Sequence, residues 1–494
     1  MTASEQLAQF AAGSKALPKL CREYKKERAT VHLKELVGGA LSFYAAAAVA
    51  KTGGVHIFVA EDRDAAAYLL NDFYNLLDEK QVYFFPSSYK RSAAYGAEDA
   101  QGVVQRTTAM NAVRGFTKGY LVVCTYPEAL AERVVDAATL QRDTIAVKLG
   151  DKISIAVLED ALADANFTRV DFVYEPGQYS VRGGIVDVFS YSESKPYRID
   201  FFGDEVDSIR RFNISSQLSA DKLDRVEIVP NLNAGEAPRV SFVQFAGSSA
   251  TCWFYEADYV LRRVNDLRRK VLADMEEPGQ IDRLLTSRNV LLRDMAGNSV
   301  VALRDNLPER PATAAVVFDT APQPKFNKNF EMLADDMIRN SLRGYATYIL
   351  SENKVQVERL ENIFHQIGRG QAAVRSLSVT LHEGFVDNDL KLCLYTDHQI
   401  FDRYQRYRIN GEIRRDEQMT VAELNQLRPG DYVVHIDHGV GRFDGLVKIN
   451  ENGKVHEAIK LVYKDGDVLF VNVHSLHRIS RYKSGDGEPP KVYK

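Results

Sequence analysis

The sequence predicts a multi-domain α/β protein that ends in a small all-β barrel, and three observations support this fold class. The chain has 494 residues, which is more than one hydrophobic core organises at about 100–200 residues per domain. Short apolar runs alternate with helical patterns through much of it, as in a parallel sheet covered by helices. Residues 421–482 instead alternate apolar and polar positions between Gly-Asp and Asn-Gly turns, which is typical of a small barrel.

The first part of the chain has the pattern of a helix-covered sheet. Residues 3–30 are typical of an amphipathic helix, the residues from 31 onward of a helix or loop, and an Ala-rich helix follows. The apolar runs VHIFVA (55–60), VYFFP (82–86) and GYLVVCT (119–125) predict strands.

The middle of the chain changes pattern twice. Residues 145–212 alternate strand patterns with Gly-rich turns, which predicts a small mixed or antiparallel module. Long charged helices follow, notably over 256–275. Residues 313–400 return to strand–helix alternation, with helices expected over 329–342 and 354–368.

Composition excludes several classes of protein. A hydrophobic content of 45% and a charged content of 26% are ordinary for a soluble globular protein. No apolar run approaches the ~18 residues of a membrane span, and the N-terminus lacks the pattern of a secretory leader. A net charge of −4 argues against a surface that coats nucleic acid non-specifically. The scattered residues Cys21, Cys124, Cys252 and Cys393 form no C-x-x-C pair, so we expect buried, reduced thiols.

A glycine-rich stretch, Gly38-Gly39-Ala40-Leu41-Ser42, stands where an α/β nucleotide-binding domain carries its phosphate loop. A working loop needs a lysine that reaches the β- and γ-phosphates, followed by a Ser or Thr for Mg²⁺. Phe43 and Tyr44 follow here instead. We therefore expect a degenerate loop, with Gly38, Gly39 and Ser42 as its remnants. We also expect no catalytic residue, no cofactor and no metal in this chain.

The acidic stretch GDEVD (203–207) could be mistaken for the metal-binding box of a nucleotide hydrolase, because the strand pattern IDFF precedes it. Without a phosphate loop there is nothing for the metal to bridge. A hairpin turn with exposed acids is the favoured interpretation.

Two further patterns have a bland and a functional interpretation. His435 and His438 form one H-x-x-H pair and His474 and His477 another, but residues three apart on a strand point to opposite faces and chelate poorly. A turn at 438–441 is favoured over a metal site. The second pattern interleaves arginines with tyrosines, as either a nucleic-acid stacking surface or a linker would. Its residues are Arg403, Tyr404, Arg406, Tyr407, Arg408, Arg414 and Arg415.

Two stretches resemble known families. Residues 176–219, which include SVRGG, PYRID and DFFGD, are similar to a segment shared by UvrB, the damage-verification subunit of excision repair, and the transcription-repair coupling factors. Residues 429–446 and 457–482 are similar to the RNA-polymerase-interacting domain of those coupling factors, a Tudor-like barrel that CarD-type regulators share. Because UvrB lacks the second piece and CarD-type proteins lack the first, the chain resembles the coupling factors.

The resemblance covers essentially the whole chain and implies the N-terminal half of such a factor, without the translocase motor that follows the barrel in the family. It implies a degenerate UvrB-homology module, a small α/β domain and a Tudor/SH3-like β-barrel. The implied division is 1–127, a UvrB-like domain 1A; 128–208, domain 2; 209–312, domain 1B and the return to 1A; 313–412, domain 3; 413–422, a linker; and 423–494, the polymerase-interacting domain.

The resemblance also implies docking residues. In this family domain 2 docks onto UvrA, and the matching positions are Arg182, Arg198 and Phe202. Arginines on a rigid sheet form bidentate pairs with partner carboxylates, and an aromatic side chain can anchor an interface. The alternative is that the arginines pair within the domain, with Asp187, Asp200 or Asp204, and that Phe202 belongs to the core.

For RNA polymerase, the family implies that an edge strand of the barrel pairs with the β subunit. Strand addition supplies main-chain hydrogen bonds. The candidate strand is EAIKLVY (457–463), with Ile459, Lys460 and Leu461 at its centre.

The implied function is a scaffold that links a stalled RNA polymerase to UvrA in transcription-coupled repair. The resemblance further implies a cytoplasmic bacterial monomer that reaches DNA upstream of the polymerase through the full-length protein. Because the family masks the UvrA-docking face with its C-terminal end, we expect this chain to expose that face. The alternatives are a UvrB-like ATPase or helicase, which the missing lysine disfavours, and a CarD-like regulator that binds polymerase but not UvrA. Residues 70–100 contain no aromatic-rich hairpin of the UvrB kind, so direct damage recognition is not expected.

Overall fold

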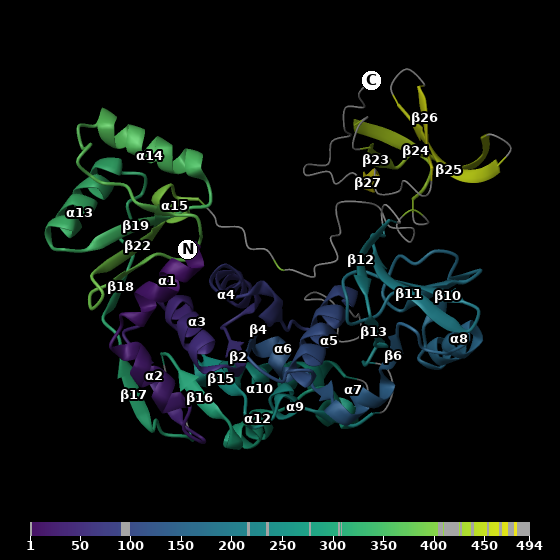
Figure 1. The fold of residues 1–494 in the computed structure, drawn as a ribbon, viewed down its shortest axis with the longest axis horizontal. Coiled ribbons are helices and arrows are strands. Elements are labelled where there is room, and N and C mark those ends of the chain that lie inside the picture. The colour runs from purple at the N-terminus through teal and green to yellow at the C-terminus, as the bar shows by residue number, and fades with distance from the viewer. Residues whose placement is uncertain are drawn as a thin grey trace.

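The computed structural model folds into an N-terminal parallel sheet with its helices, a β-rich domain, a second α/β domain and a C-terminal sheet (Figure 1). The residues described are 2–89, 99–214, 218–233, 237–275, 278–304, 307, 309–403, 409, 424, 427–435, 439–451, 454–463, 467–472 and 479–481.

The N-terminal sheet has seven strands, and every neighbouring pair in it is parallel. In spatial order its strands are β17 (Ala314–Val317), β1 (Thr30–Lys34), β16 (Ser299–Ala302), β15 (Thr251–Phe254), β2 (Gly54–Val59), β4 (Tyr120–Thr125) and β3 (Val82–Phe84). Because helices cover both faces of such a sheet, its inner strands are continuously apolar, as the buried runs of β2, β4 and β15 are. The parallel sheet expected from the sequence is confirmed.

Helices flank this sheet. They are α1 (Ala3–Ala12), α2 (Ala16–Tyr24), α3 (Ala40–Thr52), α4 (Arg63–Leu76), α5 (Ala100–Arg114), α6 (Pro127–Ala131), α7 (Ala137–Asp143), α9 (Phe242–Ala246), α10 (Ala257–Asp274), α11 (Ile281–Leu284) and α12 (Arg288–Asp294). Their starts follow from capping side chains. Thr2 and Glu5 form a capping box on α1, and Asp62 accepts the amide of Ala65 at the start of α4.

The expectation of a helix or loop from residue 31 is wrong, because Thr30–Lys34 forms strand β1. The strand lies between β16 and β17. His32 interrupts the apolar pattern of this strand, which makes the strand hard to recognise in the sequence. The Nε2 atom of His32 lies 2.9 Å from the carbonyl oxygen of Leu303. A polar residue is therefore satisfied inside the sheet by a partner 271 positions away.

Domain 2 has a hydrophobic core of its own, which includes Val147 at its start and Ile228 at its end. Its strands form a sheet in the order β12 (Ser219–Leu223), β11 (Glu205–Phe212), β10 (Tyr197–Phe202), β9 (Ile185–Val188), β8 (Gln178–Arg182) and β7 (Thr168–Arg169), with α8 (Ile155–Asp164) and the separate pair β6 (Ile145–Lys148) and β13 (Arg225–Ile228). The domain thus spans 145–228 rather than 128–208. Residues before 145, such as Leu130 and Leu140, pack into the first core, and β12 and β13 extend the domain beyond 208.

Domain 3 is a mixed sheet with helices. In spatial order its strands are β18 (Thr320–Pro322), β21 (Phe385–Asp387), β22 (Leu392–Thr396), β19 (Ala346–Leu350) and β20 (Ser376–Leu377), and its helices are α13 (Phe330–Leu342), α14 (Lys354–Gln366) and α15 (Asp397–Ile400). Both long helices lie where the sequence predicts them. The strand Ala314–Val317 pairs with β1, however, so it belongs to the N-terminal sheet and not to the domain expected to begin at 313.

The C-terminal strands form an antiparallel sheet in the order β26 (Val468–Asn472), β25 (Lys454–Val462), β24 (Gly439–Glu451), β23 (Tyr432–His435) and β27 (Ile479–Arg481). This confirms the all-β expectation. Among the described residues, β26 and β27 do not pair with each other, so the closed barrel stays a prediction.

Candidate protein-docking surfaces

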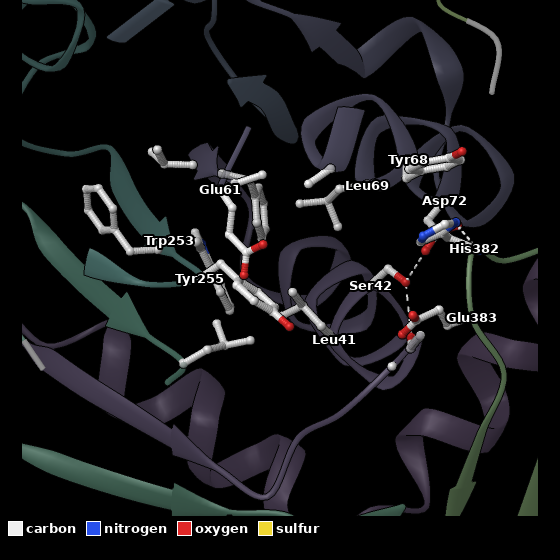
Figure 2. Close-up of a pocket in the computed structure, with 18 residues that line it drawn as sticks. Leu41, Ser42, Glu61, Tyr68, Leu69, Asp72, Trp253, Tyr255, His382 and Glu383 are labelled. Carbon is white, nitrogen blue, oxygen red and sulfur yellow. Dashed lines mark hydrogen bonds between the residues drawn. The ribbon is translucent and has the colours of Figure 1, made fainter. Parts of the chain in front are cut away.

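The glycine-rich loop lies between β1 and helix α3, so its topology is that of a phosphate loop. Gly38 has a φ of 57°, a conformation that favours glycine. The hydroxyl that would serve Mg²⁺ is engaged inside the protein, because Ser42 Oγ donates to Asp72 Oδ2 at 2.6 Å (Figure 2). Asp72 lies on α4 and is buried, and burial raises its pKa to about 7.

Residues 381–384 of domain 3 close this loop from outside, and we call their contact with α3 and α4 the joint. A Cβ atom built on Gly39 would lie 2.1 Å from the carbonyl oxygen of Glu383. The amide of His382 donates to Asp72 Oδ1 at 2.7 Å, and Asn75 donates to the carbonyl of Thr380 at 2.9 Å. Protein backbone therefore occupies the approach that a phosphate group would need.

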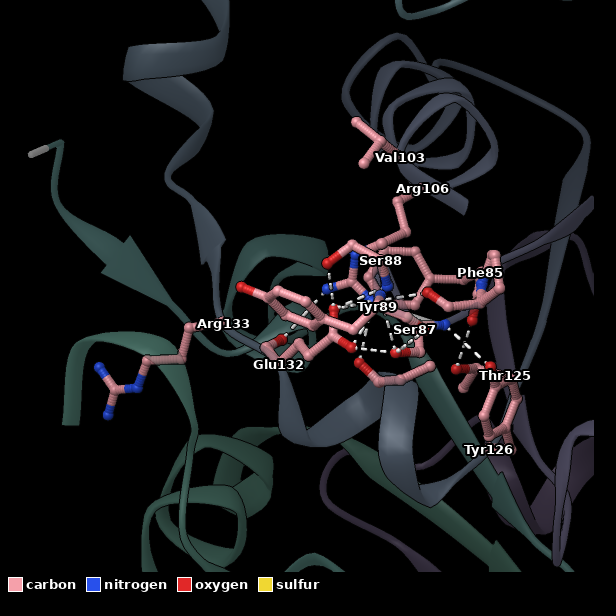
Figure 3. A network of polar contacts seen from close by, with 12 residues as sticks. Phe85, Ser87, Ser88, Tyr89, Val103, Arg106, Thr125, Tyr126, Glu132 and Arg133 are labelled. Carbon is pink, nitrogen blue, oxygen red and sulfur yellow. Dashed lines mark hydrogen bonds and ion pairs between the residues drawn. The ribbon is translucent and has the colours of Figure 1, made fainter. Parts of the chain in front are cut away.

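A buried ion pair, Arg106–Glu132, supports the two chain segments that flank residues 90–98 (Figure 3). The Arg106 guanidinium lies 4.0 Å from the centre of the Phe85 ring and donates to the carbonyl of Pro86 at 2.7 Å. The Glu132 carboxylate in turn accepts hydrogen bonds from the amide and the hydroxyl of Ser88, at 3.0 and 2.7 Å. The expectation about a hairpin falls mainly on 90–98, which lie outside the described residues.

The outer face of domain 2 is built by strand alternation. Cross-strand partners lie on the same side of a sheet, and residues two apart on a strand do too. Arg198 pairs with Asp187, while Arg182 and Asp200 both pair with Ile185. Their neighbours along the strands, such as Val186 and Ile199, face the core. We call the outer residues Arg182, Asp187, Arg198, Asp200 and Phe202 the docking face.

The two arginines of this face hold one buried carboxylate. Arg198 grips Asp187 with two hydrogen bonds, Nε–Oδ1 at 2.7 Å and Nη2–Oδ2 at 2.9 Å, and this bonding raises the pKa of Arg198. Arg182 donates to the same carboxylate. The side chain of Asp187 is 1% exposed, that of Arg198 15% and that of Arg182 36%. Arg198 is therefore chiefly a structural partner of Asp187, whereas the side chain of Arg182 remains partly exposed.

Phe202 lies at the end of the docking face and is 84% exposed. A bulge after Asp200 shifts the register, and Phe201 packs against the core, so Phe202 points outward. The next residues form the two-residue turn of a hairpin, with Gly203 at φ 62°. The hairpin interpretation of GDEVD is confirmed, and the expected alternative that Phe202 belongs to the core is wrong.

The candidate polymerase strand is not an edge strand, so the expectation placed on it is wrong. Strand β25 pairs with β24 on one side and with β26 on the other. Ile459 and Leu461 are fully buried, and Lys460 forms an ion pair with Asp444 at 2.7 Å. Main-chain groups that already bond two neighbours cannot accept a third strand. Alternation alone does not distinguish an edge strand from a central one.

Among the described residues, the edges of this sheet are β26 and β27. Strand β26 is the longer, with five residues against three. Two of its apolar side chains are exposed, Val468 at 45% and Phe470 at 49%. An edge with exposed apolar side chains is the kind of surface that accepts an added strand.

The remaining expectations have mixed outcomes. All four cysteines are buried and unpaired, as expected. Within the described ranges no helix is long and apolar enough to cross a bilayer, and no group of three or more His, Cys, Asp or Glu side chains could hold a metal ion. The side chains of His435, His438, His474 and His477 lie outside the described residues, as do Tyr404, Arg406, Tyr407, Arg408, Arg414 and Arg415. Arg403 is described and lies 3.7 Å from Asp397.

Comparison with known proteins finds two family models that match parts of the chain. Residues 145–233 match the model of the UvrB interaction domain, and residues 427–483 match that of the CarD-like/TRCF RID domain. The transcription-repair-coupling factor of Bacillus subtilis is 23% identical to the chain and that of Escherichia coli 24%, each over 94% of this chain and 46% of the relative. The corresponding protein of Staphylococcus haemolyticus is 23% identical over 86% of this chain. The chain thus spans about half the length of these relatives. Over nearly its whole length it is similar to the N-terminal half of transcription-repair-coupling factors, and it carries both a UvrB interaction domain and a CarD-like/TRCF RID domain.

Proposed function

We propose that the chain links RNA polymerase to the excision-repair protein UvrA. Domain 2 binds UvrA, the C-terminal sheet binds the polymerase β subunit, and the N-terminal sheet with domain 3 holds the two at a distance. The observation that carries the proposal is Phe202, a large aromatic side chain that is 84% exposed beside a row of paired charges. An aromatic anchor rimmed by polar groups is the usual composition of a protein interface.

We further propose that this chain hydrolyses no nucleotide and acts as a monomer. The loop lacks its lysine, Ser42 is bonded to Asp72, and the backbone of Glu383 lies against Gly39. A phosphate group at this loop would meet no lysine or arginine among the lining residues described. It would also have to displace residues 381–384 of domain 3.

The change Phe202→Ala is expected to weaken UvrA binding at least tenfold, about 1.4 kcal/mol, and to leave the free energy of unfolding unchanged. The exposed ring contributes little to the fold but anchors the partner. Arg182→Ala is a suitable second variant, because Arg198 still holds Asp187 when Arg182 is removed. Binding of purified UvrA, measured by surface plasmon resonance with polymerase binding as an internal standard, tests both.

The matched control is Leu342→Ala. Leu342 is 85% exposed and lies on α13 of domain 3, so it has the same exposure but a different surface. If Phe202→Ala binds UvrA as tightly as Leu342→Ala does, the docking face is not the UvrA site. If the unmodified chain binds polymerase but never UvrA, a CarD-like regulator becomes the better proposal.

For the polymerase contact, we propose strand addition on β26 in place of β25. Phe470→Ser is expected to weaken polymerase binding about fivefold, close to 1 kcal/mol, because the added strand packs its side chains against Phe470. Leu446→Ser is the control, since Leu446 is 42% exposed on β24, an interior strand of the same sheet. Equal loss of binding in both variants, measured with the isolated polymerase, would show that β26 has no special role.

A further inference from the structure

A cavity of about 230 Å³ remains beside the closed phosphate loop. It lies between the loop, the start of α4, the ends of β2 and β15, and residues 382–383 of domain 3. Pockets for drug-sized ligands measure about 300–1,000 Å³. This cavity therefore suits a small ligand, and no part of the proposed coupling function uses it.

Carboxyl groups stand at both ends of this cavity. Figure 2 shows Glu61 at one end, and Asp72 and Glu383 at the other. Leu41 and Leu69 lie between the two ends and make the middle apolar. A ligand that fills the cavity would therefore meet an acidic group, then an apolar surface, then acidic groups again.

No lysine or arginine belongs to the described lining. The nearest cation recorded for Glu61 is Arg304, whose Nη1 lies 3.9 Å from Glu61 but 3.2 Å from Glu256. Its guanidinium is stacked 4.6 Å from the centre of the Tyr255 ring. Burial, together with the neighbouring Glu256, raises the pKa of Glu61, and Arg304 acts in the opposite direction. An anionic ligand is disfavoured at both ends.

Aromatic rings line each end. Tyr255 lies beside Glu61, and at the other end the ring of Tyr68 stacks on His382 with 3.7 Å between ring centres. Aromatic faces attract ammonium groups. The stack also connects α4 to domain 3, so the end of the cavity that Asp72 and Glu383 line is part of the joint.

We propose that this cavity binds an aliphatic diamine cation, the chemical class of the polyamines, with one ammonium group at Glu61, the other at Glu383, and the alkyl chain against Leu41 and Leu69. Each ammonium group gains a charge-assisted hydrogen bond with a carboxylate, and the methylene groups are removed from water. The cavity beside a decayed phosphate loop thereby takes a cation where its topology suggests an anion. Because it spans the joint, the ligand holds domain 3 against the N-terminal sheet.

Isothermal titration of the full chain at ~0.15 M salt tests the proposal, with diamines H₂N–(CH₂)n–NH₂ of increasing length, spermidine, the monoamine pentylamine, and ATP. We expect one diamine length to bind best, pentylamine at least tenfold more weakly, and ATP not at all. Glu61→Gln and Glu383→Gln are each expected to weaken the best diamine at least tenfold. Glu352→Gln, which removes the same charge from an exposed position, should leave binding unchanged.

Several results would overturn the proposal. Equal affinity for diamine and monoamine would remove the two-ended geometry. Equal weakening by Glu352→Gln would reveal non-specific attraction to an acidic surface. No heat from any amine at millimolar concentration would show that the cavity takes no such ligand. Neither UvrA nor polymerase enters the assay, so its failure leaves the coupling proposal untouched.

Discussion

The change Arg198→Ala is expected to cost domain 2 about 3–5 kcal/mol of stability, because it leaves a buried carboxylate without its main partner. Asp187 is 1% exposed, and Arg198 supplies its two-point contact. The substitution also removes the guanidinium that lies 4.4 Å from the centre of the Phe212 ring. Arg182 donates to one oxygen of this carboxylate through Nη2, so it does not replace the two-point contact of Arg198.

Hydrogen exchange on the full chain measures this effect locally, through the protection of amides in β9 and β10. Arg225→Ala is the control, because Arg225 is 49% exposed and its pair with Glu227 lies at the surface, where such a pair contributes about 0–1 kcal/mol. Asp187→Asn combined with Arg198→Ala should recover much of the lost protection, since no unpaired charge remains. If Arg198→Ala alone is as stable as Arg225→Ala, Asp187 does not need Arg198.

This expectation changes how docking must be tested. A variant of Arg198 that no longer binds UvrA has also lost part of the domain, and the two causes look alike in a pull-down. Phe202 and Arg182 separate them, because neither is the main support of a buried charge. The residues proposed to contact UvrA thus divide into an exposed aromatic residue, a partly exposed arginine and a structural arginine.

The change Gly39→Ala is expected to open the joint between domain 3 and the N-terminal sheet. Gly39 has φ −65° and ψ −5°, so alanine adopts its backbone without strain. The cost is steric, because the new Cβ would lie 2.1 Å from the carbonyl oxygen of Glu383. Overpacking typically costs about 1–3 kcal/mol and more where backbone must move, and this backbone is held by the bond from His382 to Asp72.

Limited proteolysis and hydrogen exchange at residues 381–387 report the opening. Gly279→Ala is the matched control, since nothing lies within 4 Å of its Cβ position. We expect faster hydrogen exchange at residues 381–387 in Gly39→Ala and an unchanged exchange rate there in Gly279→Ala. Unchanged protection in both would show that the loop yields at little cost and that the joint does not depend on a glycine.

Much of the architecture could be predicted locally. The buried runs of β2, β4 and β15 are apolar on both faces, and helices α10, α13 and α14 carry the 3.6-residue pattern of a half-buried helix. The missing lysine after Gly39 likewise needs no structure to be seen. The period-two pattern of 145–212 indicates a sheet and places Phe202 near a turn.

The functional detail depended on which strands become neighbours. Strand β25 has the alternation of any β-strand, and only pairing on both sides shows that Ile459 and Leu461 are interior. Arg182 and Arg198 are 16 positions apart in the sequence, and only the register of β8, β9 and β10 brings both to Asp187. The sequence offers Asp187, Asp200 and Asp204 as possible partners of these arginines, and only the strand register selects Asp187.

Sequence by itself indicated the long helices α10, α13 and α14, the strands β2, β3 and β4, the absence of a lysine after Gly39 and the likeness to coupling factors, because each depends on neighbours within a few residues or on matched motifs. Tertiary structure decided which arginine is structural, which strand is an edge, and what lies against Gly39. Those outcomes depend on contacts between segments far apart in the chain, such as Ser42, Asp72 and His382. Burial then sets their energetics, since a charge or hydroxyl removed from water must find its partner inside the protein.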